Sequence, residues 1–305
     1  MSVFTAVTEA ELAGWLLACK AGALHAMRAV EGGVENTNYC IDTARGRFVL
    51  TLFEWQTADE AERTLALTAT LADAGLPVAR PWPQPGGWTA PLAGKPAALA
   101  DWIDGSHPEV PTLNQCSEIG GFLGQCASVG AVLRTAIANP RDAAWRARTA
   151  AKLPPDPLRD AALADATALP VLPSGLIHAD LFRDNALFDG DSLRGVIDFH
   201  YACTGPFLYD VAVAALDWCW AGDALDVGRL RALCGAYAAQ REPEQAERAA
   251  FGALLQLAAL RFWLSREHDA LHPRPGRAVQ VKDGGEMRAR LAALHGSSQH
   301  WPDIG

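Results

Sequence analysis

The sequence predicts an α+β fold of two lobes, in which a small antiparallel β-rich lobe is followed by a larger, mainly helical one. Three observations predict it. The chain has 305 residues, whereas one domain usually holds on the order of 100 to 200. Short strand patterns fill residues 26–53, and long helical patterns follow residue 206. The pattern changes after residue 103, so we expect an N-terminal lobe of residues 1–103 and a C-terminal lobe of residues 104–305.

The N-terminal lobe begins with three predicted strands joined by glycine-containing turns. The segments in order read AMRAVEG, GVENTN, YCIDT, ARGR and FVLTLFE. Runs rich in β-branched and aromatic residues between such turns are typical of strands. We therefore expect an antiparallel sheet at the start of the chain.

A helix follows these strands. Thr57 and Glu60 form a capping-box pattern at its start, and Gly75 ends it. The prolines between residues 77 and 85 exclude continued helix. Two further strands, over residues 88–92 and 97–103, are expected to turn at Gly94.

The C-terminal lobe is predicted to hold a helix over residues 112–137, irregular proline-rich chain near residues 153–157, and long helices after residue 206. A short apolar strand leads into the stretch HADLFRDN at residues 178–185. The segment NALFDGDSLRGVIDF that follows predicts a hairpin with its turn at residues 189–192.

This hairpin brings three oxygen-bearing side chains together. With the turn centred near residue 190, Asn185 lies about opposite Val196 and Ile197, so Asp198 emerges beside Asn185 and close to Asp180. Amide and carboxylate oxygens at one point suit Mg²⁺, which completes its octahedron with waters and substrate phosphates. We expect Asn185 and Asp198 to hold the ion and Asp180 to orient a hydroxyl and accept its proton.

The composition excludes several classes of protein. A net charge of −9 and a sequence pI near 5.4 disfavour a nucleic-acid surface, because such a surface needs clustered Lys and Arg. Seven cysteines without a CxxC pair indicate reduced thiols in a cytoplasmic protein. The N-terminus lacks the basic start and apolar run of a signal peptide. Charged or polar residues break each long apolar run, so we expect no membrane span.

The pattern H-x-D-x-x-x-x-N followed by I-D-F resembles the catalytic loop and metal-binding segment of the protein-kinase-like fold, and HADLFRDN is most similar to its aminoglycoside and choline kinase branch. The segments SVFTAVT, ENTNY, FVLTLFE, VIDFHYAC and RFWLSR extend the resemblance over nearly the whole chain. Within that branch they resemble homoserine kinases of the aminoglycoside phosphotransferase type. A metal hydrolase is disfavoured, since HExxH and paired-His ligand spacings are absent among the eight histidines.

The resemblance implies roles for individual residues of the catalytic loop. It makes Asp180 the catalytic carboxylate, Asn185 and Asp198 the magnesium ligands, and His178 a residue that holds the loop. Asp210, at the start of the next helix, resembles the family aspartate that braces the loop, although it is equally suited to cap that helix.

The resemblance also implies an ATP site. Its phosphate-binding residues would be Gly32 and Gly33, together with Asn36, Thr37 and Asn38, because backbone donors there can approach phosphate oxygens. The linker from Leu99 through Asp101 to Trp102 falls where the family contacts adenine through main-chain hydrogen bonds.

One departure concerns the phosphates. Protein kinases place a lysine in the third strand to pair with ATP phosphates, but FVLTLFE has Thr51 there. Either Mg²⁺ and backbone donors carry most of that charge, or another cation such as Arg28, Arg47 or Lys20 reaches in. We favour the first. Glu62, which would pair with the missing lysine, is then expected to be only a surface charge.

Four charged residues leave two interpretations open. Arg183 meets a phosphate or pairs with a neighbouring carboxylate. Arg261 and Arg266 lie among apolar residues, so each forms an internal salt bridge or binds substrate. Homoserine carries a carboxylate and an ammonium, which Arg261 or Arg266 together with Asp217 would recognise.

We therefore expect an ATP- and Mg²⁺-dependent kinase that converts L-homoserine to O-phospho-L-homoserine, a precursor of threonine. Two alternatives remain. One is a kinase of the same fold that acts on an aminoglycoside, choline or methylthioribose. The other is a nucleotide-binding protein without phosphotransfer, which the missing strand lysine suggests and the intact Asp180, Asn185 and Asp198 argue against.

Overall fold

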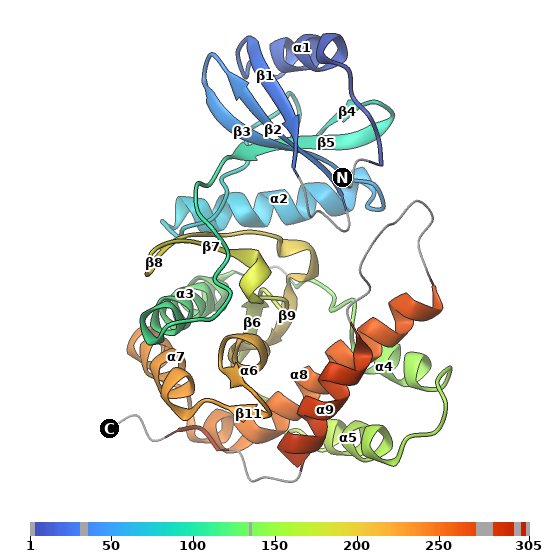
Figure 1. The fold of residues 1–305 in the computed structure, drawn as a ribbon, viewed down its shortest axis with the longest axis vertical. Coiled ribbons are helices and arrows are strands. Elements are labelled where there is room, and N and C mark those ends of the chain that lie inside the picture. The colour runs from blue at the N-terminus through green and yellow to red at the C-terminus, as the bar shows by residue number, and fades with distance from the viewer. Residues whose placement is uncertain (1–3, 31–35, 134–135, 273–282, 296–299, 303–305) are drawn as a thin grey trace. The chain divides into compact units, whose positions relative to one another are not determined.

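A computed structural model describes the chain except for residues 1–3, 31–35, 134–135, 273–282, 296–299 and 303–305 (Figure 1). The described chain divides into two compact units, the first ending at Asp104 and the second beginning at Gly105. The first contains a five-stranded antiparallel sheet and the second is mainly helical, which confirms the predicted fold class. No helix in these described ranges combines the length and the apolar character needed to span a membrane.

The first unit confirms the predicted strands. Its sheet has the order β1-β2-β3-β5-β4, and every neighbouring pair is antiparallel. Gly94 makes the predicted turn between β4 and β5 with φ +76°, a conformation that favours glycine. The elements are α1 (Glu9–Ala18), β1 (Leu24–Ala29), β2 (Thr37–Thr43), β3 (Gly46–Leu52), α2 (Ala58–Asp73), β4 (Ala90–Leu92) and β5 (Lys95–Asp101).

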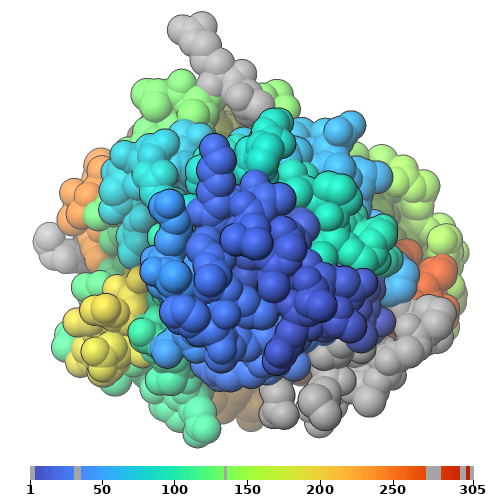
Figure 2. Space-filling view, turned by 90° about the horizontal axis from the view of Figure 1, so that it is seen from above, coloured from blue at the N-terminus to red at the C-terminus, as the bar shows by residue number. Residues whose placement is uncertain are grey.

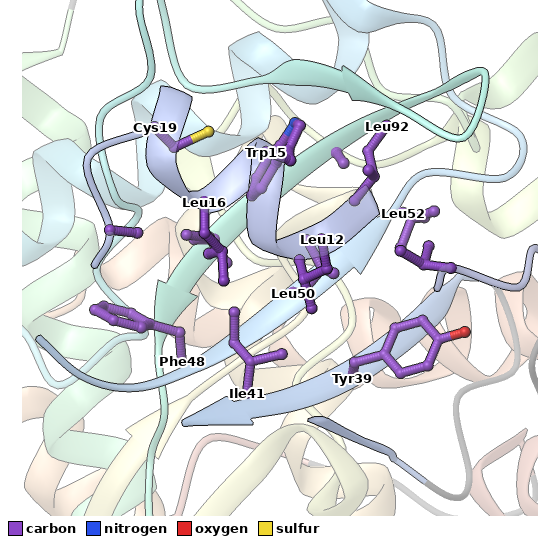
Figure 3. Close-up of a cluster of buried hydrophobic side chains, with 14 residues drawn as sticks. Leu12, Trp15, Leu16, Cys19, Tyr39, Ile41, Phe48, Leu50, Leu52 and Leu92 are labelled. Atoms are coloured by element: carbon purple, nitrogen blue, oxygen red, sulfur yellow. The ribbon is translucent and has the colours of Figure 1, made fainter. Parts of the chain in front are cut away.

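Helix α1 covers one face of this sheet. Its buried side chains meet those that alternate along the strands, as a pleated strand requires. Figure 3 shows this cluster, which includes Leu12, Trp15, Leu16, Tyr39, Ile41, Phe48, Leu50 and Leu52. Figure 2 looks onto this unit and shows the dark blue residues near the start of the chain on its outer surface.

Helix α2 lies on the opposite face of the sheet, where Ala61 packs against Phe53 and Ala98 (Figure 1). The predicted capping box is confirmed, since Thr57 and Glu60 each accept from the other's backbone N–H. The interpretation of Glu62 as only a surface charge was wrong. Its carboxylate accepts hydrogen bonds from the backbone N–H of Trp88 (2.9 Å) and of Thr89 (2.6 Å), so it anchors the loop before β4.

The second unit surrounds one buried helix. In α6, eleven of the twelve residues are buried, because the helix packs against α3, α8 and β6 (Figure 1). The elements are α3 (Leu113–Val132), α4 (Ala143–Ala150), α5 (Pro157–Thr167), β6 (Ser174–Ile177), β7 (Ala186–Asp189), β8 (Ser192–Val196), β9 (Cys203–Pro206), α6 (Phe207–Trp218), β10 (Trp220–Ala221), β11 (Ala224–Leu225), α7 (Val227–Gln240), α8 (Gln245–Leu271) and α9 (Gly284–His295), with short 3₁₀ helices at Arg183–Asn185 and Phe199–Tyr201.

The helix predicted over residues 112–137 ends at Val132, five residues earlier. The reason is a pairing distant in sequence. Ile137 donates its N–H to Thr204 Oγ1 (2.9 Å) and accepts from the N–H of Thr204 (2.9 Å). The chain at Ile137 therefore pairs with β9 instead of extending the helix.

Helix α3 packs directly on the backbone of α7. A Cβ at Gly120 would lie 2.0 Å from the carbonyl oxygen of Leu233, whereas a Cβ at Gly121 would meet nothing within 4 Å. We expect Gly120→Ala to lower the free energy of unfolding by about 1–3 kcal/mol or more. Gly121→Ala is the matched control and should raise it by about 0.5–1 kcal/mol, because alanine favours helix. Urea unfolding monitored by circular dichroism measures both, and equal midpoints for the two variants would contradict the close contact.

Candidate active site

The stretch HADLFRDN connects β6 to a hairpin, as predicted. Strands β7 and β8 pair Ala186 with Val196 and Asp189 with Ser192. The N–H of Ile197 then donates to the carbonyl of Asn185 (3.0 Å). Because Asp198 follows Ile197 directly, the hairpin brings its backbone next to that of Asn185.

Four hydrogen bonds close a ring around this turn of chain. The N–H of Asp180 donates to His178 Nδ1 (3.2 Å), and His178 Nε2 donates to the carbonyl of Ile197 (3.1 Å). Ile197 is bonded to Asn185 as above, and Asn185 Nδ2 donates to the carbonyl of Asp180 (2.9 Å). Hydrogen bonds thus join both His178, at the start of the loop, and Asn185, at its end, to Ile197 of the hairpin.

Asp210 supports the loop from the start of α6. Its carboxylate accepts from the N–H of His178 (2.7 Å) and of Ala179 (2.6 Å), and it is buried. Ala179 has φ +62°, a left-handed conformation that costs a non-glycine residue about 1–2 kcal/mol. The two hydrogen bonds to Asp210 hold the backbone in that conformation.

His178 lies behind the loop with 2% of its surface exposed. Burial lowers the pKa of its imidazole, and the two ring hydrogen bonds fit the neutral tautomer with the proton on Nε2. The ring also packs against Phe199 with centroids 4.5 Å apart. These contacts suit a residue that holds the loop.

Asp180 is partly open to solvent, with 19% of its side chain exposed. Arg261 of α8 is almost fully buried and places Nη1 3.2 Å from Asp180 Oδ1. Burial raises the pKa of Asp180, the charge of Arg261 lowers it, and the neighbouring charge of Asp198 raises it again. Two carboxylates therefore lie close enough to repel each other.

The donor set at this point fits a small divalent cation. Because Nδ2 of Asn185 donates to Asp180, its Oδ1 faces away as an acceptor. Asp198 has no Lys or Arg partner within the described ranges, and its Oδ1 lies 3.6 Å from Nε2 of His200. One amide oxygen and one carboxylate beside a second carboxylate are the oxygen ligands that Mg²⁺ prefers.

Arg183 pairs with a neighbouring carboxylate, which was one of its two interpretations. Its Nε and Nη2 reach the two carboxylate oxygens of Asp217 at 2.9 and 3.0 Å, and its backbone N–H also donates to Asp217 (2.8 Å). Nη1 donates to the carbonyl of Glu109. The structure thus brings Asp217 to Arg183, not to Arg261 or Arg266.

Arg266 is bonded to the beginning of α9. Its Nη1 lies 2.6 Å from a carboxylate oxygen of Glu286 and donates to the carbonyl of Asp283 (2.8 Å). With 9% of its surface exposed, it forms the internal salt bridge that was the alternative to substrate binding.

The predicted phosphate-binding residues are partly described. Gly32 and Gly33 lie outside the described residues. Asn36, Thr37 and Asn38 form hydrogen bonds within the first unit: Asn36 Oδ1 accepts from the N–H of Glu54 (3.2 Å), Thr37 Oγ1 donates to the Glu54 carboxylate (2.7 Å), and Asn38 Oδ1 accepts from Thr51 Oγ1 (2.8 Å). These side chains fix the strand that follows the loop.

Glu54 is a buried acid that the sequence analysis missed. It accepts from Thr37 and lies 3.2 Å from Lys95 Nζ. A carboxylate directly after the apolar run FVLTLF was the available signal, since a buried acid needs a partner.

The predicted adenine linker uses its amides within the first unit. The backbone N–H of Asp101 donates to the carbonyl of Arg80 (2.9 Å), and the backbone N–H of Trp102 donates to the carbonyl of Arg47 (3.1 Å). The carbonyl of Leu99 accepts from the backbone N–H of Trp82 (2.8 Å). The adenine contact of these residues stays a prediction.

The strand position expected for a lysine is filled by a neutral pair, Thr51 with Asn38. Arg28 lies across from Cys40 on the same face of the sheet and stacks on Trp102 at 5.4 Å, whereas Arg47 pairs with Asp42 (2.8 Å). Arg28 and Arg47 were the strand arginines considered in place of the missing lysine. Of these two, Arg28 has no acid partner among the described residues.

Comparisons with known proteins identify the family. The model of the "Phosphotransferase enzyme family" matches residues 26–247. The chain is 41% identical to homoserine kinase of Methylobacillus flagellatus over 93% of this chain and 92% of that protein, and 39% identical to homoserine kinase of Methylobacillus glycogenes over 99% and 100%. An amicoumacin kinase solved with AMP-PNP, Ca²⁺ and its substrate has a similar fold, with a TM-score of 0.68 and 14% identity over 95% of each chain. The chain belongs to the phosphotransferase enzyme family.

Proposed function

We propose that this chain transfers the γ-phosphoryl group of ATP to the hydroxyl of L-homoserine, giving O-phospho-L-homoserine. The observation that carries the proposal is the full-length similarity to homoserine kinases, joined to a loop in which Asp180, Asn185 and Asp198 converge. Full-length similarity near 40% identity favours the same acceptor, while the loop supplies the groups that phosphoryl transfer needs.

Asp180 acts on the acceptor. Its carboxylate is held by Arg261 on one side and by the ring of hydrogen bonds behind it, so it keeps a fixed direction. It orients the homoserine hydroxyl in line with the γ-phosphate and accepts its proton during transfer. The partial exposure of its side chain leaves room for a substrate hydroxyl.

Asn185 Oδ1 and the Asp198 carboxylate would hold Mg²⁺. The bound ion neutralises negative charge on the phosphates of ATP, and this lowers the cost of a nucleophile approaching them. Backbone donors near the start of β2 stay the proposed contacts of the ATP phosphates. The amicoumacin kinase was solved with AMP-PNP and Ca²⁺, which supports a nucleotide and a divalent cation as cofactors here.

We also propose that the enzyme works in the cytoplasm. All seven cysteines are unpaired thiols and all are buried. Such usage is typical of reducing compartments, where disulfides are rare.

A panel of acceptors tests the proposed function. ADP release is measured with ATP, Mg²⁺ and either L-homoserine, an aminoglycoside, choline or methylthioribose. We expect a kcat/KM for L-homoserine about 100-fold or more above that for any other acceptor, because a site shaped for one set of polar groups discriminates by several kcal/mol. Turnover with an aminoglycoside and none with L-homoserine would contradict the proposal.

A further inference from the structure

One arginine near Asp180 lacks a carboxylate partner in the described part of the chain. Arg183, Arg261 and Arg266 each pair with an acid. Arg141, which precedes α4, instead stacks on aromatic rings, with its Cζ 4.3 Å from the ring centroid of Trp145 and 5.4 Å from that of Tyr201. Its charge is therefore available to a ligand.

Tyr201 connects this arginine to the catalytic loop. Arg261 stacks on the same ring at 4.8 Å and contacts Asp180 at 3.2 Å. Arg141 Nη2 also lies 3.5 Å from the Tyr201 hydroxyl. The two guanidinium groups thus share one aromatic ring, one of them bonded to Asp180 and the other without an acid.

Three buried polar atoms of this region have no hydrogen-bond partner among the residues that the structure describes. They are Arg141 Nε, Ser265 Oγ and His268 Nδ1. Arg261, Ser265 and His268 are four and three residues apart on α8, so they lie along one face of that helix. His268 reaches the ring of Trp145, with centroids 5.8 Å apart, and Trp145 is the ring on which Arg141 stacks.

Unpartnered atoms of this kind indicate a missing ligand. Leaving such an atom buried without a hydrogen bond is unfavourable. The donors here are a guanidinium N–H and a hydroxyl. The acid next to Arg141 in the sequence, Asp142, caps α4 by accepting from the N–H of Trp145 (2.7 Å). An anion rather than a cation therefore suits the cluster.

We propose that Arg141 binds the carboxylate of the acceptor, with the Ser265 hydroxyl as a second donor. This inference rests on the proposed function, because L-homoserine is the acceptor that carries such a group. A planar guanidinium matches a carboxylate with two parallel hydrogen bonds. The acceptor then lies with its hydroxyl at Asp180 and its carboxylate at Arg141, and Tyr201 stands between the two arginines.

The test compares L-homoserine with 3-aminopropan-1-ol, which is homoserine without its carboxylate. Both are assayed by ADP release with the wild type, Arg141→Met and Arg141→Lys. Arg148→Met is the matched control, since Arg148 is an exposed arginine on α4, the helix that follows Arg141. Thermal unfolding of each variant is recorded alongside.

In the wild type we expect kcat/KM for L-homoserine to exceed that for 3-aminopropan-1-ol by about 100-fold or more, since a charged hydrogen-bonded pair contributes about 1.5–3 kcal/mol per bond. Arg141→Met should lower the value for L-homoserine by a similar factor and leave 3-aminopropan-1-ol and the KM for ATP unchanged. Arg141→Lys keeps the charge without the planar geometry, so its loss should be about 10-fold. Arg148→Met should match the wild type.

Two results would overturn the inference, and they differ from each other. If the wild type phosphorylates L-homoserine and Arg141→Met keeps the wild-type preference between the two acceptors, only the role of Arg141 is wrong. If the wild type does not phosphorylate L-homoserine, the proposed function fails and the inference fails with it. Should Arg141→Met not fold, unchanged selectivity in Arg141→Lys would also overturn the role of Arg141.

Discussion

Asp180→Asn is expected to lower kcat for phosphoryl transfer by about 10²–10⁴-fold, the range typical of removing a general base. The amide keeps the shape of the side chain but cannot accept the hydroxyl proton. The bonds of the Asp180 backbone to His178 and Asn185 are unaffected, so the loop should keep its geometry. Steady-state ADP release gives kcat, and nucleotide titration should show an ATP dissociation constant close to that of the wild type.

Two further variants separate this role from that of a metal ligand. Asp198→Asn weakens the proposed Mg²⁺ site, so its activity should recover as the Mg²⁺ concentration is raised, whereas the activity of Asp180→Asn should not. Asp189→Asn, at an exposed acid of the same hairpin, should behave as the wild type. Full activity in Asp180→Asn would refute the assignment of the base, and an unchanged Mg²⁺ requirement in Asp198→Asn would refute that of the ligand.

Asp210→Ala is expected to have the largest effect on stability. Two buried backbone N–H groups, of His178 and Ala179, would lose their acceptor. At about 1–3 kcal/mol for each unsatisfied group, the loss is about 2–6 kcal/mol, a large part of the 5–15 kcal/mol by which a typical domain is stable. Urea unfolding measures it, and kcat should fall in parallel because the loop depends on those bonds.

Graded variants check the physical cause. Asp210→Asn keeps one acceptor oxygen, so its loss of stability should be about half that of Asp210→Ala. Asp165→Ala removes an exposed acid from α5 and should stay within about 0.5 kcal/mol of the wild type. A wild-type unfolding midpoint for Asp210→Ala would show that the carboxylate does not support the loop.

Features set by short stretches of sequence were predictable. The hairpin register follows from the turn at residues 189–192, and it places Asp198 after the residue bonded to Asn185. The start of α2 follows from its capping box. Helix α1 was missed although its signals are of the same kind, with a capping box of Thr8 and Glu11 before an apolar stripe.

Features set by partners distant in sequence were not predictable. Arg183 had two interpretations, and its partner Asp217 lies 34 residues away. Arg266 pairs with Glu286 across 20 residues. Charge and spacing identify such side chains as buried cations that need a partner, but only the packing of α6, α8 and α9 decides which acid each one meets. The position of Arg141 against Trp145 and Tyr201 also depends on packing, and its sequence context carried no signal.

The four hydrogen bonds that join His178, Ile197, Asn185 and Asp180 make the active centre preorganised. The chain itself sets the spacing between the proposed base and the proposed metal ligand Asn185, so the entropy of arranging them is lost during folding and not in each catalytic cycle. Any motion of this loop must therefore carry these groups together.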